Sequence, residues 1–191
     1  MLQLLGLTGP ARSGKDTVAD YLVRHHGYHR IAFADPLKQM VAGFLNISLD
    51  RLEQVKDSWV TPFGCTPRRL LQTLGTEWGR DLIGINTWTI AAAQRVAPLL
   101  AAGERVVISD VRFASETAHV RAQGGILWHL VRPDAPSVDD HASELGVPMG
   151  EEDAVLLNVG TLAELYDQIE DQLAHPGDWW APPGLALRGL I

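Results

Sequence analysis

The chain has 191 residues, of which 46% are hydrophobic and 20% charged, and its formal net charge is -7. This length is typical of one domain with a sizeable core and disfavours two full domains. The negative charge disfavours a broad basic surface for duplex nucleic acid, and no apolar run reaches the roughly 18 residues that a membrane-spanning helix needs.

The first segment, residues 1–7, has no basic stretch and runs directly into a glycine-rich motif. We therefore expect a buried strand there rather than a signal peptide. Cys65 is the only cysteine, which excludes an internal disulfide and a metal site built on thiolates. These features together predict a cytoplasmic protein without a membrane partner.

Short apolar runs predict five strands, because each run is apolar on both faces, as buried parallel strands are. They cover residues 2–8, 30–34, 105–109, 126–131 and 154–157. Helical patterns separate them, and the last is introduced by Thr161 with Glu164 three residues later, a pairing typical of a capping box. Alternating strands and helices predict an α/β fold with a five-stranded parallel sheet flanked by helices.

One connection is much longer than the dozen or so residues that a minimal crossover needs, because residues 36–104 separate the second and third strands. This stretch predicts a helical insertion with helices at 36–45, 48–57, 67–82 and 87–101. A second irregular stretch, 133–152, is rich in proline and glycine and is predicted to be a lid. We therefore expect one domain over 1–174 and a tail, 175–191, without periodicity.

Residues 9–17 read Gly-Pro-Ala-Arg-Ser-Gly-Lys-Asp-Thr and match the pattern G-x-x-x-x-G-K, directly after a predicted strand and before a predicted helix. Glycines at positions 9 and 14 let backbone N–H groups approach phosphate oxygens, and the helix N-terminus adds partial positive charge. Lys15 is placed to bridge the terminal phosphates. The motif predicts ATP contacts from Gly9, Ala11, Arg12, Ser13, Gly14, Lys15, Asp16 and Thr17.

Two carboxylates are candidate magnesium ligands. Asp16 stands where this motif normally has a serine or threonine, and Asp110 ends the apolar strand 105–109. Alternatively, Asp16 is only a favourable acidic residue in the first helical turn, and Thr17 supplies a hydroxyl to the phosphates. Arg112 follows on the same strand edge, where it either neutralises phosphate charge or pairs with Glu116.

The predicted helix 67–82 carries two different stripes. Leu70, Leu74, Trp78 and Leu82 recur every four residues and are expected to face the core. The polar positions Arg69, Thr73, Thr76 and Arg80 form another stripe, beside Arg68, Gln72, Gly75 and Gly79. A flat base and a phosphate fit such a surface, since guanidinium groups bind phosphate in bidentate geometry. The alternative is that Arg80 pairs with Glu77 on a solvated face.

Several segments together resemble one known family. They are Phe33-Ala-Asp-Pro-Leu-Lys38, Leu71-Gln-Thr-Leu-Gly-Thr-Glu-Trp-Gly-Arg80, Ser109-Asp-Val-Arg-Phe113, His141-Ala-Ser-Glu144 and Asn158-Val-Gly-Thr-Leu162. With the phosphate loop and in this order, they are similar to the phage-type deoxynucleoside monophosphate kinases over residues from about 4 to 173. The resemblance implies a P-loop nucleoside monophosphate kinase-like fold, a dNMP acceptor, ATP as donor and Mg²⁺.

The resemblance also implies site residues. It makes Asp35 and Lys38 acceptor candidates and places Arg68, Gln72, Trp78 and Arg80 in or near the dNMP pocket, to which the polar stripe adds Arg69 and Thr76. It places Asn158, Gly160 and Thr161 beside the adenine of ATP. The alternatives are structural: Asp35-Pro36 starts a helix, Trp78 belongs to the core, and residues 158–161 form a capping turn.

The expected mechanism is in-line attack of an acceptor phosphate oxygen on the γ-phosphorus, with Lys15, magnesium at Asp110 and arginines neutralising charge. The candidate arginines for contacts with the transferring phosphoryl group are Arg12, Arg112 and Arg132. The stretch 133–152 contains no arginine, and its His141 is the weakest of the candidate site residues. A phosphate is largely ionised near neutral pH, since its second pKa is about 6, so no general base is required.

Two rival functions remain. A different small-molecule kinase, such as a dephospho-coenzyme A kinase, has the same loop but a hydroxyl acceptor. A regulatory or assembly protein keeps the nucleotide-binding loop without turnover, because a fold does not fix a function. A homodimer, formed through the insertion helices or through Trp179 and Trp180 of the tail, is a further hypothesis.

Overall fold

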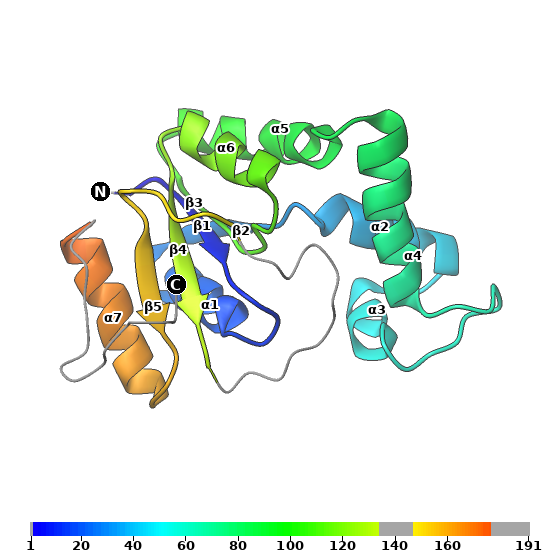
Figure 1. Cartoon of the computed structure of the whole chain (residues 1–191), viewed down its shortest axis with the longest axis horizontal. Coiled ribbons are helices and arrows are strands. Elements are labelled where there is room, and N and C mark those ends of the chain that lie inside the picture. Colours follow the sequence, from blue (N-terminus) through cyan, green and yellow to red (C-terminus); the bar gives the residue numbers. More distant parts are fainter. Residues whose placement is uncertain (1, 134–146, 177–191) are drawn as a thin grey trace.

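The computed structural model describes residues 2–133 and 147–176. Its centre is a parallel five-stranded sheet with the order β2-β3-β1-β4-β5 (Figure 1). The strands are β1 (Leu4–Thr8), β2 (Tyr28–Ile31), β3 (Arg105–Ile108), β4 (Ile126–Val131) and β5 (Ala154–Leu157). The predicted fold class and number of strands are confirmed.

The second strand lies earlier than the predicted range 30–34. β2 ends at Ile31, whose register partner on β3 is Ile108. After Ile31 the backbone N–H group of Ala32 donates to the carboxylate of Asp35, and those of Phe33 and Ala34 donate to the carboxylate of Asp110. Phe33 is buried although it lies in a turn, which explains why the sequence alone suggested a longer strand.

Helices cover both faces of the sheet. On one face, α1 (Lys15–His26) and α7 (Leu162–Ala174) pack through Val18, Leu22, Leu165 and Ile169. On the other face, α5 (Thr87–Ala101) and α6 (Ala114–Ala122) contribute Ala92, Val96 and Val120. Two apolar clusters therefore enclose the sheet, which explains why the strands are apolar on both faces.

The predicted capping box of the last helix is confirmed. The hydroxyl of Thr161 accepts a hydrogen bond from the backbone N–H of Glu164 at 3.3 Å, and the carboxylate of Glu164 accepts one from the backbone N–H of Thr161 at 2.6 Å. This reciprocal pair satisfies two N–H groups that the first helical turn leaves without a partner. It fixes the start of α7 beside the end of β5.

The long insertion forms a group of helices beside the sheet (Figure 1). They are α2 (Asp35–Leu45), α3 (Leu49–Val55), α4 (Pro67–Thr73) and a π-helix, η1 (Leu74–Ile83). Val41, Ala42 and Leu52 form a separate small core, against which Leu70 and Leu74 pack. We call residues 35–86 the cap.

The π-helix changes which side chains of the cap face inward. A regular helix over 67–82 was expected to bury Trp78 and Leu82, but these side chains are 40% and 77% exposed. In a π-helix the hydrogen bonds join residues five apart, so the four-residue spacing of the apolar stripe no longer follows one face. Gly75 and Gly79 are buried instead. The prediction of a core-facing stripe is therefore wrong beyond Leu74.

Two predicted segments lie wholly or mostly outside the described residues. They are most of the lid, with residues 134–146 and its His141, and most of the tail, with residues 177–191 and its two tryptophans. Over residues 2–133 and 147–176, no helix combines the length and the apolar composition that crossing a membrane requires.

Candidate functional site

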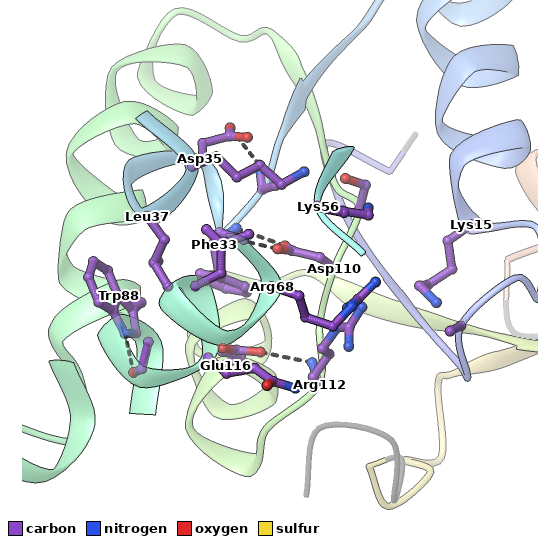
Figure 2. Close-up of a pocket in the computed structure, with 18 of the residues that line it drawn as sticks. Lys15, Phe33, Asp35, Leu37, Lys56, Arg68, Trp88, Asp110, Arg112 and Glu116 are labelled. Atoms are coloured by element: carbon purple, nitrogen blue, oxygen red, sulfur yellow. Dashed lines mark hydrogen bonds between the residues drawn. The ribbon is translucent and has the colours of Figure 1, made fainter. Parts of the chain in front are cut away.

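A cavity of about 900 Å³ lies between the phosphate loop, the ends of β2 and β3, and the cap. Its size suits a ligand of nucleotide dimensions. Figure 2 shows Lys15 reaching it from one side and Leu37 and Trp88 from the other, with Asp110 and Arg112 between them. The parallel sheet explains the location, because ligands of such sheets bind beyond the carboxyl ends of the strands.

The phosphate loop is a tight turn between β1 and α1. Gly9 and Gly14 have φ angles of 134° and 108°, which side chains other than glycine rarely adopt. The ammonium group of Lys15 donates to the carbonyl oxygens of Gly9 and Pro10, each at 2.7 Å. The side-chain amide of Asn158 donates to the carbonyl oxygen of Ser13 at 2.9 Å, which joins the start of the α7 turn to the loop.

The predicted donor-site residues fall into four groups. Ala11, Arg12, Lys15 and Asp16 line the cavity, whereas Gly9, Ser13, Gly14 and Thr17 build the turn and the first helical turn without lining it. Arg132 and Asn158 contact the loop without lining the cavity, and Arg132 donates to the carbonyl oxygen of Arg12 at 3.4 Å. Gly160 and Thr161 are exposed at the start of α7, outside the cavity lining.

Asp16 faces the cavity and pairs with Arg30 of β2. The guanidinium of Arg30 also donates to Asp20 at 2.9 Å and to the hydroxyl of Ser109 at 3.2 Å. Arg30 therefore connects α1 with the end of β3. The carboxylate of Asp16 remains 83% exposed, so it is accessible to a ligand as well as to the arginine.

Asp110 occupies the switch between β3 and the following loop. Its two carboxylate oxygens accept hydrogen bonds from the backbone nitrogens of Phe33 at 2.7 Å and Ala34 at 2.9 Å. Burial raises the pKa of the Asp110 carboxyl above its ordinary value, although these two hydrogen bonds act in the opposite direction. Asp110 thus holds the entrance to the cap against the end of β3.

Carboxylates on or beside α3 hold three of the cap cations that line the cavity. Glu53 pairs with Lys38 and Lys56, each at 2.6 Å, and Asp57 pairs with Arg68 through both oxygens. Burial acts to raise the pKa of Glu53, but the lysine hydrogen bonds outweigh it and lower the pKa. The Arg68 hydrogen bond likewise holds the pKa of Asp57 below its ordinary value.

The far wall of the cavity belongs to α2, α4, η1 and the start of α5. Arg68, Gln72, Thr76 and Arg80 line it as the polar stripe suggested. Lys38 and Asp35, which the family resemblance suggested, line it too, and Asp35 pairs with Arg95 at 2.8 Å. Arg69 and Trp78 do not line it. Arg69 is exposed and lies 3.4 Å from Glu77, and Trp78 packs against Trp88, with ring centroids 6.1 Å apart.

Arg80 pairs with Glu116 of α6 at 2.6 Å, so the alternative pairing of Arg80 with Glu77 is wrong. Glu116 entered the sequence argument only as a partner for the Arg112 side chain. Its carboxylate instead accepts from the backbone nitrogen of Arg112 at 2.8 Å, while the Arg112 side chain lines the cavity. Burial raises the pKa of Glu116 above its ordinary value, as does the charge of Asp110, and Arg80 opposes this effect.

The cavity differs in charge from the chain as a whole. Eight of its lining residues are lysine or arginine and six are aspartate or glutamate, whereas the complete chain has a net charge of -7. Cations line both walls, with Lys15 and Arg12 in the phosphate loop and Lys38, Lys56 and Arg68 in the cap. The arrangement suits two anionic groups that meet between these walls.

Several known proteins are similar to this chain in fold or in sequence. A solved dephospho-CoA kinase from Campylobacter jejuni superposes on this chain with a TM-score of 0.50 and 12% sequence identity. The match covers 91% of this chain and 98% of that one, and it shows a likeness of fold alone. A relative from Acanthamoeba polyphaga mimivirus is 36% identical over 87% of this chain and 93% of its own length.

Two phage proteins, each named deoxynucleotide monophosphate kinase, are also similar. The protein of Escherichia phage RB69 is 32% identical over 63% of this chain, and that of Enterobacteria phage T4 is 30% identical over 65%. The matched part spans about half of these two relatives, 48% and 49% of their lengths. Residues 52–169 match the profile of deoxynucleotide monophosphate kinases, and with the mimivirus relative this shows that the chain belongs to the deoxynucleotide monophosphate kinase family.

Proposed function

We propose that this protein transfers the γ-phosphoryl group of ATP to the phosphate of a deoxynucleoside monophosphate, giving ADP and a dNDP. The observation that carries the proposal is the cavity itself, because a phosphate loop with Lys15 faces a separate group of cations, Lys38, Lys56 and Arg68, across one space. Membership of the family supports the identity of both substrates.

The donor phosphates bind at the loop 9–17. Its glycines permit the close approach of backbone N–H groups, and the start of α1 adds the partial charge of a helix N-terminus. Lys15 exchanges its contacts with loop carbonyl oxygens for phosphate oxygens. Asn158, Gly160 and Thr161 are proposed beside the adenine, which agrees with the contact between Asn158 and the loop.

Asp16 and Asp110 are the proposed holders of magnesium. Both line the cavity with carboxylate oxygens, the ligand type that Mg²⁺ prefers, and each oxygen of Asp110 has a lone pair left after its backbone hydrogen bond. Among the described residues, no three histidine, cysteine or acidic side chains form a metal cage. This agrees with magnesium held by one or two carboxylates and the phosphates. The ion, when bound, neutralises charge on the transferring group.

The acceptor binds on the cap side. Arg68 and Lys38 are the proposed phosphate contacts, because a guanidinium binds phosphate with two parallel hydrogen bonds. The base lies against Leu37 and the buried Trp88, where Gln72 and Thr76 offer hydrogen-bonding groups. Asp35 and Arg80 shape this wall through their ion pairs, and Arg69 and Trp78 lie outside its lining.

In the reaction an acceptor phosphate oxygen attacks the γ-phosphorus in line. The bond from the γ-phosphorus to the bridging oxygen breaks, and ADP leaves with that electron pair. The acceptor is already ionised, so the protein's contribution is positioning and charge neutralisation. The proposed groups that neutralise charge are Lys15 and Arg12 of the loop, Arg112 after β3, and Arg132, which donates to the carbonyl oxygen of Arg12.

The proposed organisation is one kinase domain over 1–174, with the acceptor-binding insertion at 36–104, a lid at 133–152 and a tail at 175–191. The assignment of the insertion to acceptor binding is supported by the cap, because α2, α4 and η1 provide most of the proposed acceptor wall. The lid is proposed to exclude water from the transferring phosphoryl group, as closing segments do in kinases.

The test is ADP release coupled to a spectroscopic readout, with ATP and Mg²⁺, and with dAMP, dCMP, dGMP, dTMP, the ribonucleotides and dephospho-coenzyme A offered one at a time. We expect turnover with at least one dNMP, abolished by Lys15→Ala. Arg24→Ala is the matched control, because Arg24 is exposed in the last turn of the same helix. It should retain turnover.

Other outcomes have definite meanings. Turnover with dephospho-coenzyme A alone would replace the proposed acceptor by a hydroxyl compound. ATP binding without acceptor-dependent ADP would favour a nucleotide-binding regulatory protein. Equal rates in the Lys15→Ala variant and the wild type would show that the phosphate loop is not the site of the reaction.

A further inference from the structure

The buried ion pair between Arg80 and Glu116 joins the cap to the body of the protein. The two side chains are 11% and 3% exposed, and their charged atoms lie 2.6 Å apart. The guanidinium carbon of Arg80 lies 3.8 Å from the ring centroid of Phe113, which covers the cation with an aromatic face. Paired charges rarely lie this deep, because removing them from water is costly.

The π-helix brings Arg80 to this position. Gly75 and Arg80 are five residues apart, the spacing that π-helical hydrogen bonds join. One nitrogen of Arg80 donates to the carbonyl oxygen of Gly75 at 3.2 Å, and the indole nitrogen of Trp88 donates to the same oxygen at 2.8 Å. The backbone comes so close to Leu37 that a Cβ atom on Gly75 would lie 2.8 Å from its methyl group. Arg80 thus extends from a tightly packed turn.

Glu116 uses its second oxygen to hold the loop after β3. This oxygen accepts from the backbone nitrogens of Arg112 at 2.8 Å and Phe113 at 3.2 Å. A glutamate in the first turn of a helix often bonds the N–H group of the capping residue, so this contact alone is ordinary. A simple capping glutamate is solvated, however, whereas Glu116 is buried and its other oxygen binds a residue of the cap.

The loop from Ser109 to Phe113 is therefore held on two sides. Asp110 binds the chain where it enters the cap, at Phe33 and Ala34, and Glu116 binds both the loop backbone and Arg80 near the end of the cap. Arg112 lies between these anchors and lines the cavity. Glu116 therefore links η1, through Arg80, to the backbone of Arg112.

We propose that Arg80 and Glu116 act as a positioning pair that couples the place of the cap, and so of the acceptor, to the place of Arg112 during phosphoryl transfer. This inference rests on the proposed function. Arg80 is then not a phosphate ligand, because its guanidinium is buried against Glu116 and Phe113, whereas the Arg68–Asp57 pair is exposed. Breaking the pair lowers the turnover of bound substrates more than it weakens their binding.

The experiment is a double-mutant cycle with Glu116→Gln, Arg80→Met and the double variant. The acceptor is the one of dAMP, dCMP, dGMP and dTMP that the wild type phosphorylates fastest. We expect each single variant to lose about tenfold or more in kcat with less than about a threefold change in the KM for the acceptor. The double variant should lose no more kcat than the more impaired of the two single variants, because the two residues act as one unit.

Glu77→Gln is the matched control. Glu77 lies on the same π-helix and pairs with an arginine, but this pair is exposed and outside the cavity lining. Its kcat should equal that of the wild type. Circular dichroism and the affinity for a non-hydrolysable ATP analogue verify folding, and the affinity should not change. If Glu116→Gln does not fold, Arg80→Lys keeps the charge and should lose less kcat than Arg80→Met.

Three results would overturn the proposal. They are an unchanged kcat in folded single variants, losses that multiply in the double variant, and a raised acceptor KM at constant kcat, which would make Arg80 a direct ligand. A wild type without dNMP-dependent ADP release would instead reject the proposed function itself. The two failures are therefore distinguishable within one set of measurements.

Discussion

The indole nitrogen of Trp88 donates a hydrogen bond to the carbonyl oxygen of Gly75 at 2.8 Å, across the contact between α5 and η1. This bond joins the last helix of the insertion to the π-helix that lines the acceptor wall. Both residues face the cavity. The same ring packs directly against Gly79, where a Cβ atom would lie 2.4 Å from the nearest ring atom.

Replacing Gly79 by alanine tests this packing. A Cβ atom there would lie 2.5 Å from two ring atoms of Trp88, so we expect the free energy of unfolding to fall by about 1–3 kcal/mol, as overpacked cores do. Urea denaturation measures the change. Gly43→Ala is the control, because nothing lies within 4 Å of a Cβ at that helical position. An unaffected Gly79→Ala variant would contradict the tight contact.

Replacing Asp57 by asparagine is expected to strengthen acceptor binding. Both carboxylate oxygens of Asp57 accept hydrogen bonds from one edge of the Arg68 guanidinium, and both groups are exposed enough for water to weaken the pair. A phosphate that exchanges for this carboxylate no longer has to compete in the variant. The KM for the dNMP should fall about 1.4- to fivefold, from the roughly 0.2–1 kcal/mol that exposed pairs contribute. Steady-state kinetics measure it.

Asp81→Asn removes the same charge from an exposed position on η1, outside the cavity lining. The KM of this control should stay at the wild-type value. A raised KM in Asp57→Asn would mean that Asp57 orients Arg68 for the phosphate and does not compete with it.

Replacing Asp16 by alanine is expected to raise the magnesium concentration for half-maximal turnover by roughly tenfold, the size of effect seen when a group near a metal is lost. Asp20→Ala is the control, because Asp20 is the other carboxylate partner of Arg30 and does not line the cavity. Magnesium titrations at saturating ATP measure both. Equal titration curves would leave Asp16 with the single role of pairing with Arg30.

The stability of the fold should depend on His129. Burial lowers the pKa of His129 below its ordinary value of 6.5, and the charge of Arg121 acts in the same direction against the opposing effect of Asp153. The unfolded chain therefore takes up this proton at a higher pH than the folded chain. The contribution of neutral His129 to the free energy of unfolding is fully present above pH 6.5, and it is lost as the pH falls towards the lowered pKa.

His129→Gln should make the free energy of unfolding less dependent on pH between 7 and 5, as measured by urea denaturation. The slope is reduced and not abolished, because burial also lowers the pKa of His119. His29→Gln, at a side chain that is 49% exposed, is the control for the loss of an imidazole as such. The same slope in His129→Gln as in the wild type would exclude this role.

Local patterns were enough to predict the phosphate loop, the five strands and the capping box of α7, because each depends on neighbouring residues. The face of the helix after Thr73 was not predictable in this way. Nothing in the local spacing marks a π-helix, whose stability here comes from distant contacts of Gly75 and Gly79 with Leu37 and Trp88. The exposed Leu82 is the visible cost of that register.

The candidate site was predictable where its residues belong to a sequence motif. It was not predictable where a residue pairs with a charge that is distant in the sequence. Lys15 and Asp110 follow strands in a recognisable pattern. Glu53, Asp57 and Glu116 have their roles because folding places Lys38, Arg68 and Arg80 beside them. A glutamate three residues into a helix was the only local signal for Glu116, and it indicates capping in general.

The adjacency of β2 and β3 in the sheet makes the cap a separable module. The 15-residue helix α5 packs on the sheet and is by itself long enough for the crossover between parallel neighbours. Residues 35–86 are additional to that crossover, so their exchange is expected to change the proposed acceptor site while the phosphate loop and the sheet stay intact. A transplanted cap would need one residue that meets the buried charge of Glu116.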